Sequence, residues 1–156
     1  MFSAEPTMND QSTKTEMLRH LIATVAFRFR VAIDAAPDDF ADFRGASDVR
    51  SPGELLAHIG DLFAGSLYLL KGEFVELRSS PLPWEQEIDR CFAAMRELEV
   101  FLASGAELTF PVEKFIQGPV GDALTHVGQL VLLRRLAGSP VKEEPYFMAD
   151  ISIGRL

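Results

Sequence analysis

Hydrophobic residues recur at intervals of three and four along most of this chain, the spacing that places side chains on one face of an α-helix. The pattern predicts long amphipathic helices over about 13–36, 51–70, 83–104 and 118–138. The segment between the second and third is longer than the loops that join antiparallel neighbours, so it can cross the end of a bundle. We therefore expect an all-α fold, a four-helix bundle.

Start and stop signals frame these helices. Residues 13–16 (TKTE) and 51–54 (SPGE) each fit a capping box, and the second also has proline at the first helical position. Pro119 suits the start of the last helix, and Gly138 suits its end. The helix boundaries are thus predicted from capping as well as from periodicity.

One domain accounts for the chain, because 156 residues can bury a sizeable core without disulfides. We expect residues 1–11 to form a flexible lead-in, which lacks the basic start and apolar block of a signal peptide. Residues 12–156 form the bundle, with a C-terminal tail from about 139. That tail can pack on the bundle or on a second chain.

Composition and charge argue against several classes of function. Hydrophobic residues make up 47% and charged residues 24%, as in ordinary globular domains. A net charge of −8 without a basic patch disfavours binding to nucleic acid or to anionic membranes, and no apolar run is long enough to cross a bilayer. Cys91 is the single cysteine, so we expect a core thiol and a reducing, cytoplasmic setting.

Candidate chemistry lies on the second and last predicted helices. Asp122 and His126 are four residues apart and therefore share one helix face, where burying them is costly unless a partner pairs with them. His58 lies within the apolar stripe of the second helix. If the two helices are neighbours, two imidazoles and one carboxylate can meet and hold a divalent ion with open coordination positions.

Each of these residues also has a plainer structural interpretation. An imidazole in an apolar stripe is more often packed and hydrogen-bonded than a metal ligand, and Asp122 can simply favour the dipole at a helix start. Asp61 can orient His58 or be solvated. Gln129 can contact a ligand or close a hydrogen bond across the bundle, and His20 has a weaker claim to a pocket role.

The stretches that carry the two histidines resemble a known family. ELLAHIGD at 54–61 and HVGQLVLLRRLAGSPV at 126–141 are similar to motifs of the DinB/YfiT-like family of small bacterial metal-dependent proteins. YFMADISIG at 146–154 is similar to the tail of some members. The resemblance implies an up-down-down-up four-helix bundle that is commonly a homodimer.

The resemblance also implies three histidines around a divalent ion such as nickel, zinc or iron. His58 matches the ligand from the second helix, and His126 matches one of two ligands from the last helix. Asp122 stands where the third histidine is expected. A carboxylate there gives a harder site that favours zinc, iron or manganese over nickel, or it marks a member that has lost tight metal binding.

Two functions from different classes follow. Characterised members of the family resemble thiol-dependent transferases and isomerases, and some resemble hydrolases. The first hypothesis is therefore a metal-dependent enzyme in which the ion activates a low-molecular-weight thiol or a water for attack on a small electrophile. The alternative is a non-catalytic bundle that binds a small hydrophobic ligand or a partner, with the histidines as buried polar ties.

Overall fold

The structure, a computed structural model, describes residues 8–156, and no strand occurs in that range. The long helices are α1 (Met8–Ile33), α2 (Pro52–Leu70), α3 (Trp84–Ala103) and α5 (Gly121–Leu136). The short elements are η1 (Phe40–Asp42), α4 (Val112–Phe115), η2 (Ile116–Val120) and η3 (Tyr146–Met148). The predicted all-α fold is confirmed.

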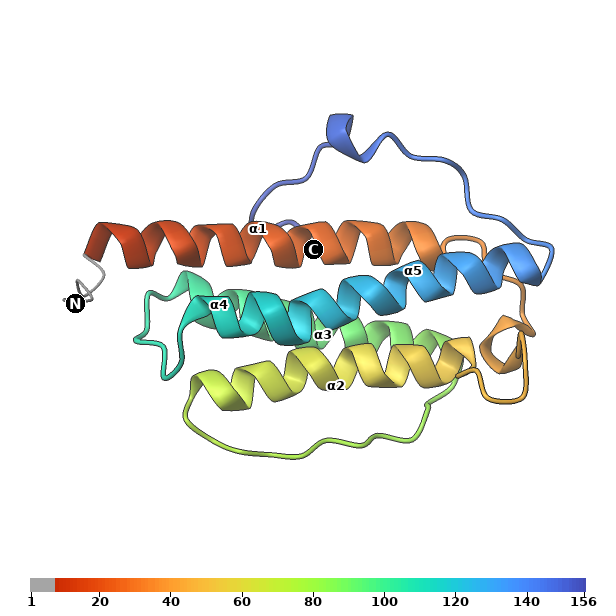
Figure 1. Ribbon diagram of the computed structural model, residues 1–156, viewed down its shortest axis with the longest axis horizontal. Helices are drawn as coiled ribbons and strands as arrows, with labels where there is room; N and C mark the ends of the chain where they lie inside the picture. The colour runs from red at the N-terminus through yellow and green to blue at the C-terminus, as the bar shows by residue number, and fades with distance from the viewer. Residues whose placement is uncertain (1–7) are drawn as a thin grey trace, which may run out of the picture.

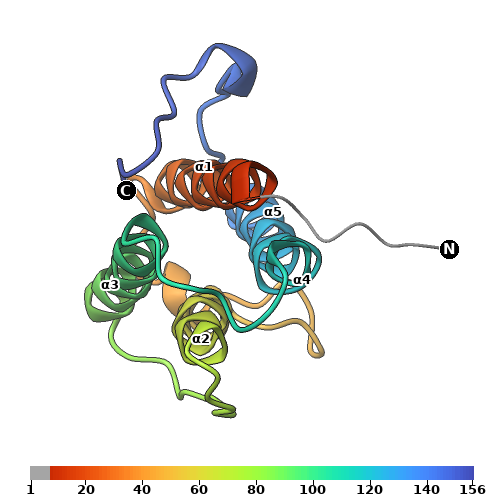
Figure 2. The ribbon, with the colours of Figure 1, turned by 90° about the vertical axis from the view of Figure 1, so that its left-hand side faces the viewer.

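The long helices pack around one apolar core (Figure 1). Viewed along the bundle, α1 lies between α3 and α5, and α2 lies between the same two helices on the opposite side (Figure 2). The largest apolar side chains that are fully buried include Phe29, Phe40, Phe63, Leu18, Ile22, Leu56, Ile59, Met95 and Leu130. None of the helices in the described range is both long enough and apolar enough to cross a membrane.

The first helix begins before the predicted capping box. It starts at Met8, so residues 13–16 lie inside it, and the prediction that they cap it is wrong. Asp10 favours the earlier start, because its carboxylate lies in the first turn and pairs with Lys14 one turn later at 2.9 Å. Residues 8–11 of the predicted lead-in therefore belong to α1, and residues 1–7 lie outside the described part of the chain.

The predicted start of α2 is confirmed. The Ser51 hydroxyl accepts a hydrogen bond from the Glu54 N–H at 3.3 Å, and the Glu54 carboxylate accepts one from the Ser51 N–H at 2.8 Å. Pro52 occupies the first helical position. Gly138, which the sequence predicts at the end of the last helix, has the positive φ that ends a helix, and so do Gly72 after α2 and Gly105 after α3.

The last helix begins earlier than the sequence predicts. Helical structure does not start at Pro119 but runs from Val112 through α4, η2 and α5 to Leu136. Pro119 therefore lies inside the run, in the π-helical turn η2. Proline has no N–H to donate and crowds the carbonyl four residues earlier, and the wider π turn accommodates both effects.

The connection between α2 and α3 runs along the outside of the bundle rather than across an end, the route that its length also allows (Figure 1). Asp61 on α2 holds it, because its carboxylate accepts hydrogen bonds from the Ser79 N–H at 2.8 Å and the Ser79 hydroxyl at 2.6 Å. Arg90 on α3 donates to the same carboxylate at 2.9 Å, to Glu87 at 2.6 Å and to the Ala57 carbonyl at 2.6 Å. This network ties α2, α3 and their connection together.

A buried arginine joins the ends of α1 and α5. The Arg134 guanidinium donates to the carbonyl oxygens of Ala32, Asp34, Ala35 and Ser139, at distances from 2.8 to 3.2 Å. Burial lowers the pKa of Arg134, which the charge of Asp34 only partly offsets. The sequence indicates only a cation in the last turn of a helix, whereas the structure shows a clamp between two helices.

The C-terminal tail folds back over α1 (Figure 1). The ring of Tyr146 meets Phe27 edge-on with centroids 6.3 Å apart, and the Arg28 guanidinium lies 4.0 Å from the centre of the Tyr146 ring. Phe147 and Met148 point into solvent, with 98% and 76% of their surface exposed. The tail therefore packs on the bundle of its own chain, one of the two positions predicted for it.

Replacing Arg134 with methionine should destabilise the protein by about 3 kcal/mol, because four backbone carbonyls lose their donor at once. Urea unfolding followed by circular dichroism measures the change. The matched control is Arg135→Met at the exposed neighbouring position, which should alter stability by less than about 0.5 kcal/mol. Equal effects of the two substitutions would contradict the role of Arg134 as a clamp.

Stability should decrease in acid through Asp61. Burial raises the pKa of Asp61, but hydrogen bonds from Ser79 and Arg90 outweigh burial and hold this pKa below its ordinary value. Because the unfolded pKa is about 3.9, the stabilisation is present above about pH 4 and is lost as pH falls through the folded pKa. The Asp61→Asn variant should therefore be less stable than wild type at pH 7, and its free energy of unfolding should fall less as the pH is lowered. Urea unfolding at a series of pH values measures both effects. Equal losses of stability in acid for the variant and the wild type would contradict this role of Asp61.

Candidate metal centre

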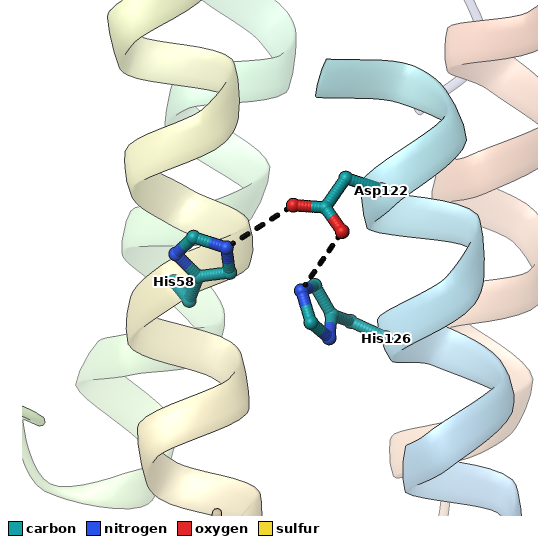
Figure 3. A group of neighbouring side chains, drawn as sticks. All are labelled: His58, Asp122 and His126. Carbon is teal, nitrogen blue, oxygen red and sulfur yellow. Dashed lines mark hydrogen bonds and ion pairs between the residues drawn. The ribbon is translucent and has the colours of Figure 1, made fainter. Parts of the chain in front are cut away.

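His58, Asp122 and His126 meet between α2 and α5 (Figure 3). His58 projects from α2, and the other two lie one turn apart on α5. The Asp122 carboxylate lies between the imidazoles, with Oδ2 3.3 Å from His58 Nε2 and Oδ1 3.2 Å from His126 Nε2. One donor atom from each residue lies within 4.8 Å of the other two. The cluster that the sequence predicts is therefore present in the fold.

The spacing of these donor atoms suits a divalent ion. Nitrogen and oxygen ligands bind zinc at about 2.0–2.2 Å, so neighbouring donors around a tetrahedral ion lie ~3.4 Å apart. The two separations between imidazole and carboxylate, 3.2 and 3.3 Å, are close to that value, and each involves a different oxygen of Asp122. With one donor atom from each residue the separations reach 4.8 Å, so the side chains would have to move closer together around an ion. Three protein ligands leave at least one coordination position for water or another small molecule.

Gln129 determines which nitrogen of His126 carries hydrogen. The Gln129 Oε1 atom lies 2.8 Å from His126 Nδ1, and with the amide in this orientation Nδ1 is the donor, because an amide oxygen can only accept. Nε2 then points its lone pair at the Asp122 oxygen 3.2 Å away. A lone pair and a carboxylate oxygen repel at this distance unless a proton or a metal ion lies between them. The arrangement is therefore suited to hold a positive charge.

The cluster is accessible from the surface. The His126 side chain is 10% exposed, that of His58 is 33% exposed and that of Asp122 is 46% exposed. The two imidazole rings meet edge to face with their centroids 4.8 Å apart. Each of the three residues borders a different surface hollow, with volumes of about 560, 720 and 700 Å³ beside His126, Asp122 and His58. A small molecule can therefore approach every member of the cluster.

The helix dipole does not account for Asp122. Helical structure is continuous from Val112, and Gly121, just before Asp122, has helical φ and ψ of −60° and −41°. Asp122 therefore lies within a helical run rather than at a free helix start. Its carboxylate instead contacts His58 and His126.

The remaining candidates are placed differently. Gln129 contacts His126 on its own helix, whereas we expected it to contact a ligand or to bond across the bundle. His20 is exposed on α1 and adds no donor to the cluster. Asp61 borders the same hollow as His58, but its carboxylate belongs to the network that holds the α2–α3 connection and does not orient the imidazole.

Cys91 lies in the core, as predicted. It is fully buried, and its thiol donates to the Leu56 carbonyl at 3.1 Å. Burial is the main cause that raises the pKa of the Cys91 thiol to about 12. The thiol therefore stays protonated at neutral pH and is a poor nucleophile or metal ligand.

Sequence reasoning misses the role of Gly121. Its N–H donates to the Ile116 carbonyl across the π turn, and a Cβ atom at this position would lie 3.1 Å from that oxygen. Only glycine fits here without a shift of the turn that leads into Asp122. The available signal is Pro119, which is equally typical of a helix start.

Comparison of the chain with models of protein families, with curated proteins and with solved structures gave no match. The established facts are an all-helical fold and a His-Asp-His cluster that could hold a metal ion. The resemblance to the DinB/YfiT-like family remains an expectation from sequence.

If the cluster binds zinc, replacing Gly121 with alanine should weaken that binding by about tenfold, the lower end of the loss seen when the supports of metal ligands are removed. The new methyl group would push the π turn away and shift Asp122. Titration of the metal-free protein with zinc measures the affinity. Gly128→Ala on the same helix is the matched control, because a Cβ there meets nothing within 4 Å. Equal zinc affinities of the two variants would contradict the positioning role of Gly121.

Proposed function

We propose that this protein is a DinB/YfiT-like metal-dependent protein that binds a divalent ion through His58, Asp122 and His126. The observation that carries the proposal is the Asp122 carboxylate between two imidazole Nε2 atoms on facing helices, at 3.2 and 3.3 Å. Gln129 adds support, because a histidine that binds a metal usually donates its other N–H to an oxygen.

The donor set favours zinc, iron or manganese over nickel. Imidazole nitrogens suit all four metals, but the Asp122 carboxylate is a harder ligand than the histidine expected at its position. Its negative charge also offsets part of the charge of a divalent ion. We propose zinc as the first metal to test, because it accepts two imidazoles and a carboxylate with a fourth position left open.

We propose a thiol-dependent transferase or isomerase, or a hydrolase, as the class of reaction. A bound divalent ion supplies a Lewis acid that lowers the pKa of a coordinated thiol or water. Gln129 keeps the hydrogen of His126 on Nδ1, and the hollows beside the histidines leave room for a low-molecular-weight thiol and a small electrophile. The thiol is expected from the family resemblance.

The proposal includes up-down-down-up connectivity, a homodimer and a cytoplasmic setting. Lys14 near the start of α1 pairs with Glu113 in α4 at 3.0 Å, and Arg134 joins the ends of α1 and α5. These contacts support parallel directions for the first and last helices. Exposed Phe147 and Met148 support contact with a second copy, and the absence of disulfide-forming cysteine pairs suits a reducing compartment.

A second candidate function is a non-catalytic bundle that binds a small hydrophobic ligand or a partner. The specific observation in its favour is that His58, Asp122, His126 and Gln129 form direct polar contacts with one another, at 2.8 to 3.3 Å. In this alternative the histidines are polar ties between α2 and α5. Their loss would lower stability and would leave the metal content unchanged.

Metal content of untagged protein, measured by mass spectrometry, tests the proposal. Wild type should carry about one divalent ion per chain, and His58→Ala, His126→Ala and Asp122→Asn should each lose it, because two remaining ligands bind weakly. His20→Ala is the matched control, since His20 is the third histidine of the chain and lies outside the cluster. Circular dichroism establishes that each variant is folded.

Two outcomes would contradict the metal proposal. One is a wild type that takes up none of zinc, iron, manganese or nickel after reconstitution. The other is metal that His20→Ala removes as readily as His126→Ala does. An empty wild type together with a marked loss of stability in His58→Ala would favour the non-catalytic bundle.

A further inference from the structure

An apolar hollow of about 560 Å³ opens beside His126, between the loop that precedes α2 and the C-terminal half of α5. Its volume falls within the range of small-molecule sites. Its apolar lining is aliphatic rather than aromatic and is made by Ala46, Val49, Leu55, Leu132, Leu133 and Leu136. Such walls suit a hydrocarbon chain.

Arg50 connects this hollow to the candidate metal centre. Of the described residues, it alone lines both the hollow beside His126 and the hollow beside His58. Arg50 therefore lies where the hollow beside His126 meets the hollow beside His58. A ligand in the hollow beside His126 can thus contact both Arg50 and His126.

Within residues 8–156, the Arg50 guanidinium forms no ion pair and no side-chain hydrogen bond. The charge of Arg50 contributes to the lowered pKa of Glu54. The Glu54 carboxylate, however, already accepts hydrogen bonds from Arg44 at 2.8 Å and from the Ser51 N–H at the start of α2. On a chain of net charge −8, an exposed arginine that lines an apolar hollow and pairs with no carboxylate is the group that can attract an anion.

We propose that this hollow binds a small aliphatic carboxylate, with its acid group at Arg50 and its hydrocarbon chain along α5 toward Leu136. The guanidinium presents a planar pair of donors that matches a carboxylate, and the leucines remove the chain from water. Asp48, which also lines the hollow, opposes an anion and limits the affinity. Identification of this ligand as the substrate class rests on the proposed metal function, whereas its binding does not need the metal.

Calorimetric titration of the metal-free full-length protein in EDTA tests the binding separately from the metal. The probe is octanoate, with octanol and octylamine as matched neutral and cationic compounds. Octanoate should bind more tightly than either, and affinity should rise about fourfold for each methylene added from hexanoate upward, the equivalent of ~0.8 kcal/mol, until the hollow is filled. Equal binding of octanol, or tighter binding of octylamine, would overturn the proposal.

Substitutions test where the carboxylate of the bound octanoate lies. Arg50→Gln should weaken octanoate about tenfold and leave octanol unchanged, because only the charged partner is lost. Arg135→Gln, on an exposed arginine outside the hollow, is the control and should bind octanoate as wild type does. Asp48→Asn should bind octanoate more tightly. Unchanged octanoate affinity in Arg50→Gln would overturn the assignment of the acid group.

The two proposals fail in different ways. Protein that carries a stoichiometric ion but binds no octanoate in EDTA overturns the carboxylate site and leaves the metal proposal standing. Octanoate that binds only the metal-loaded protein shows that the ion, and not Arg50, holds the acid group, which also overturns the assignment. Octanoate binding by a wild type that takes up no metal supports the hollow and contradicts the metal function.

Discussion

The contact of one carboxylate with two imidazoles requires α2 and α5 to keep a fixed separation and rotation, because His58 comes from one helix and Asp122 from the other. Each helix is held from its far side by a buried or half-buried arginine. Arg90 on α3 donates to the carbonyl of Ala57, the residue before His58, and Arg134 ties α5 to the end of α1. The site thus rests on helices that are supported by polar clamps inside the bundle rather than on loops, which favours a reproducible geometry.

The same contact has an electrostatic requirement. Gln129 accepts the Nδ1 hydrogen of His126, so the Nε2 lone pair and the Asp122 oxygen face each other and need a positive charge between them. A proton between His126 Nε2 and the Asp122 oxygen gives a hydrogen bond with a purely structural role. A divalent ion instead supplies positive charge to all three side chains at once. With an aspartate where the resemblance expects a third histidine, the donor set carries a negative charge of its own. That charge strengthens attraction to any cation and shifts preference toward harder metals.

The sequence directly predicts features that depend on neighbouring residues. Features that join distant residues are predicted only on the condition that two helices are neighbours, as for the His58 cluster, or are missed. The Ser51 cap is local, so its sequence signature was sufficient. Asp122 and His126 share a face by spacing alone, but their meeting with His58 depends on the phase and packing of a separate helix, which periodicity leaves open. Asp61 was misassigned because it lies one turn from His58, whereas its actual partner Arg90 lies 29 residues further along the chain.

The π turn explains why Asp122 can face His58 at all. Along the last helical run, the buried positions step from Phe115 to Val120 and then to Ala123, a gap of five followed by the ordinary gap of three. A regular α-helix continued from Phe115 would bury positions 119 and 122, which would place the carboxylate inside the apolar stripe at a large cost. The extra residue of the π turn rotates Asp122 to the edge of the stripe, where its side chain is 46% exposed and reaches His58. Pro119 therefore contributes to the site through the turn that surrounds it, although it contacts neither imidazole itself.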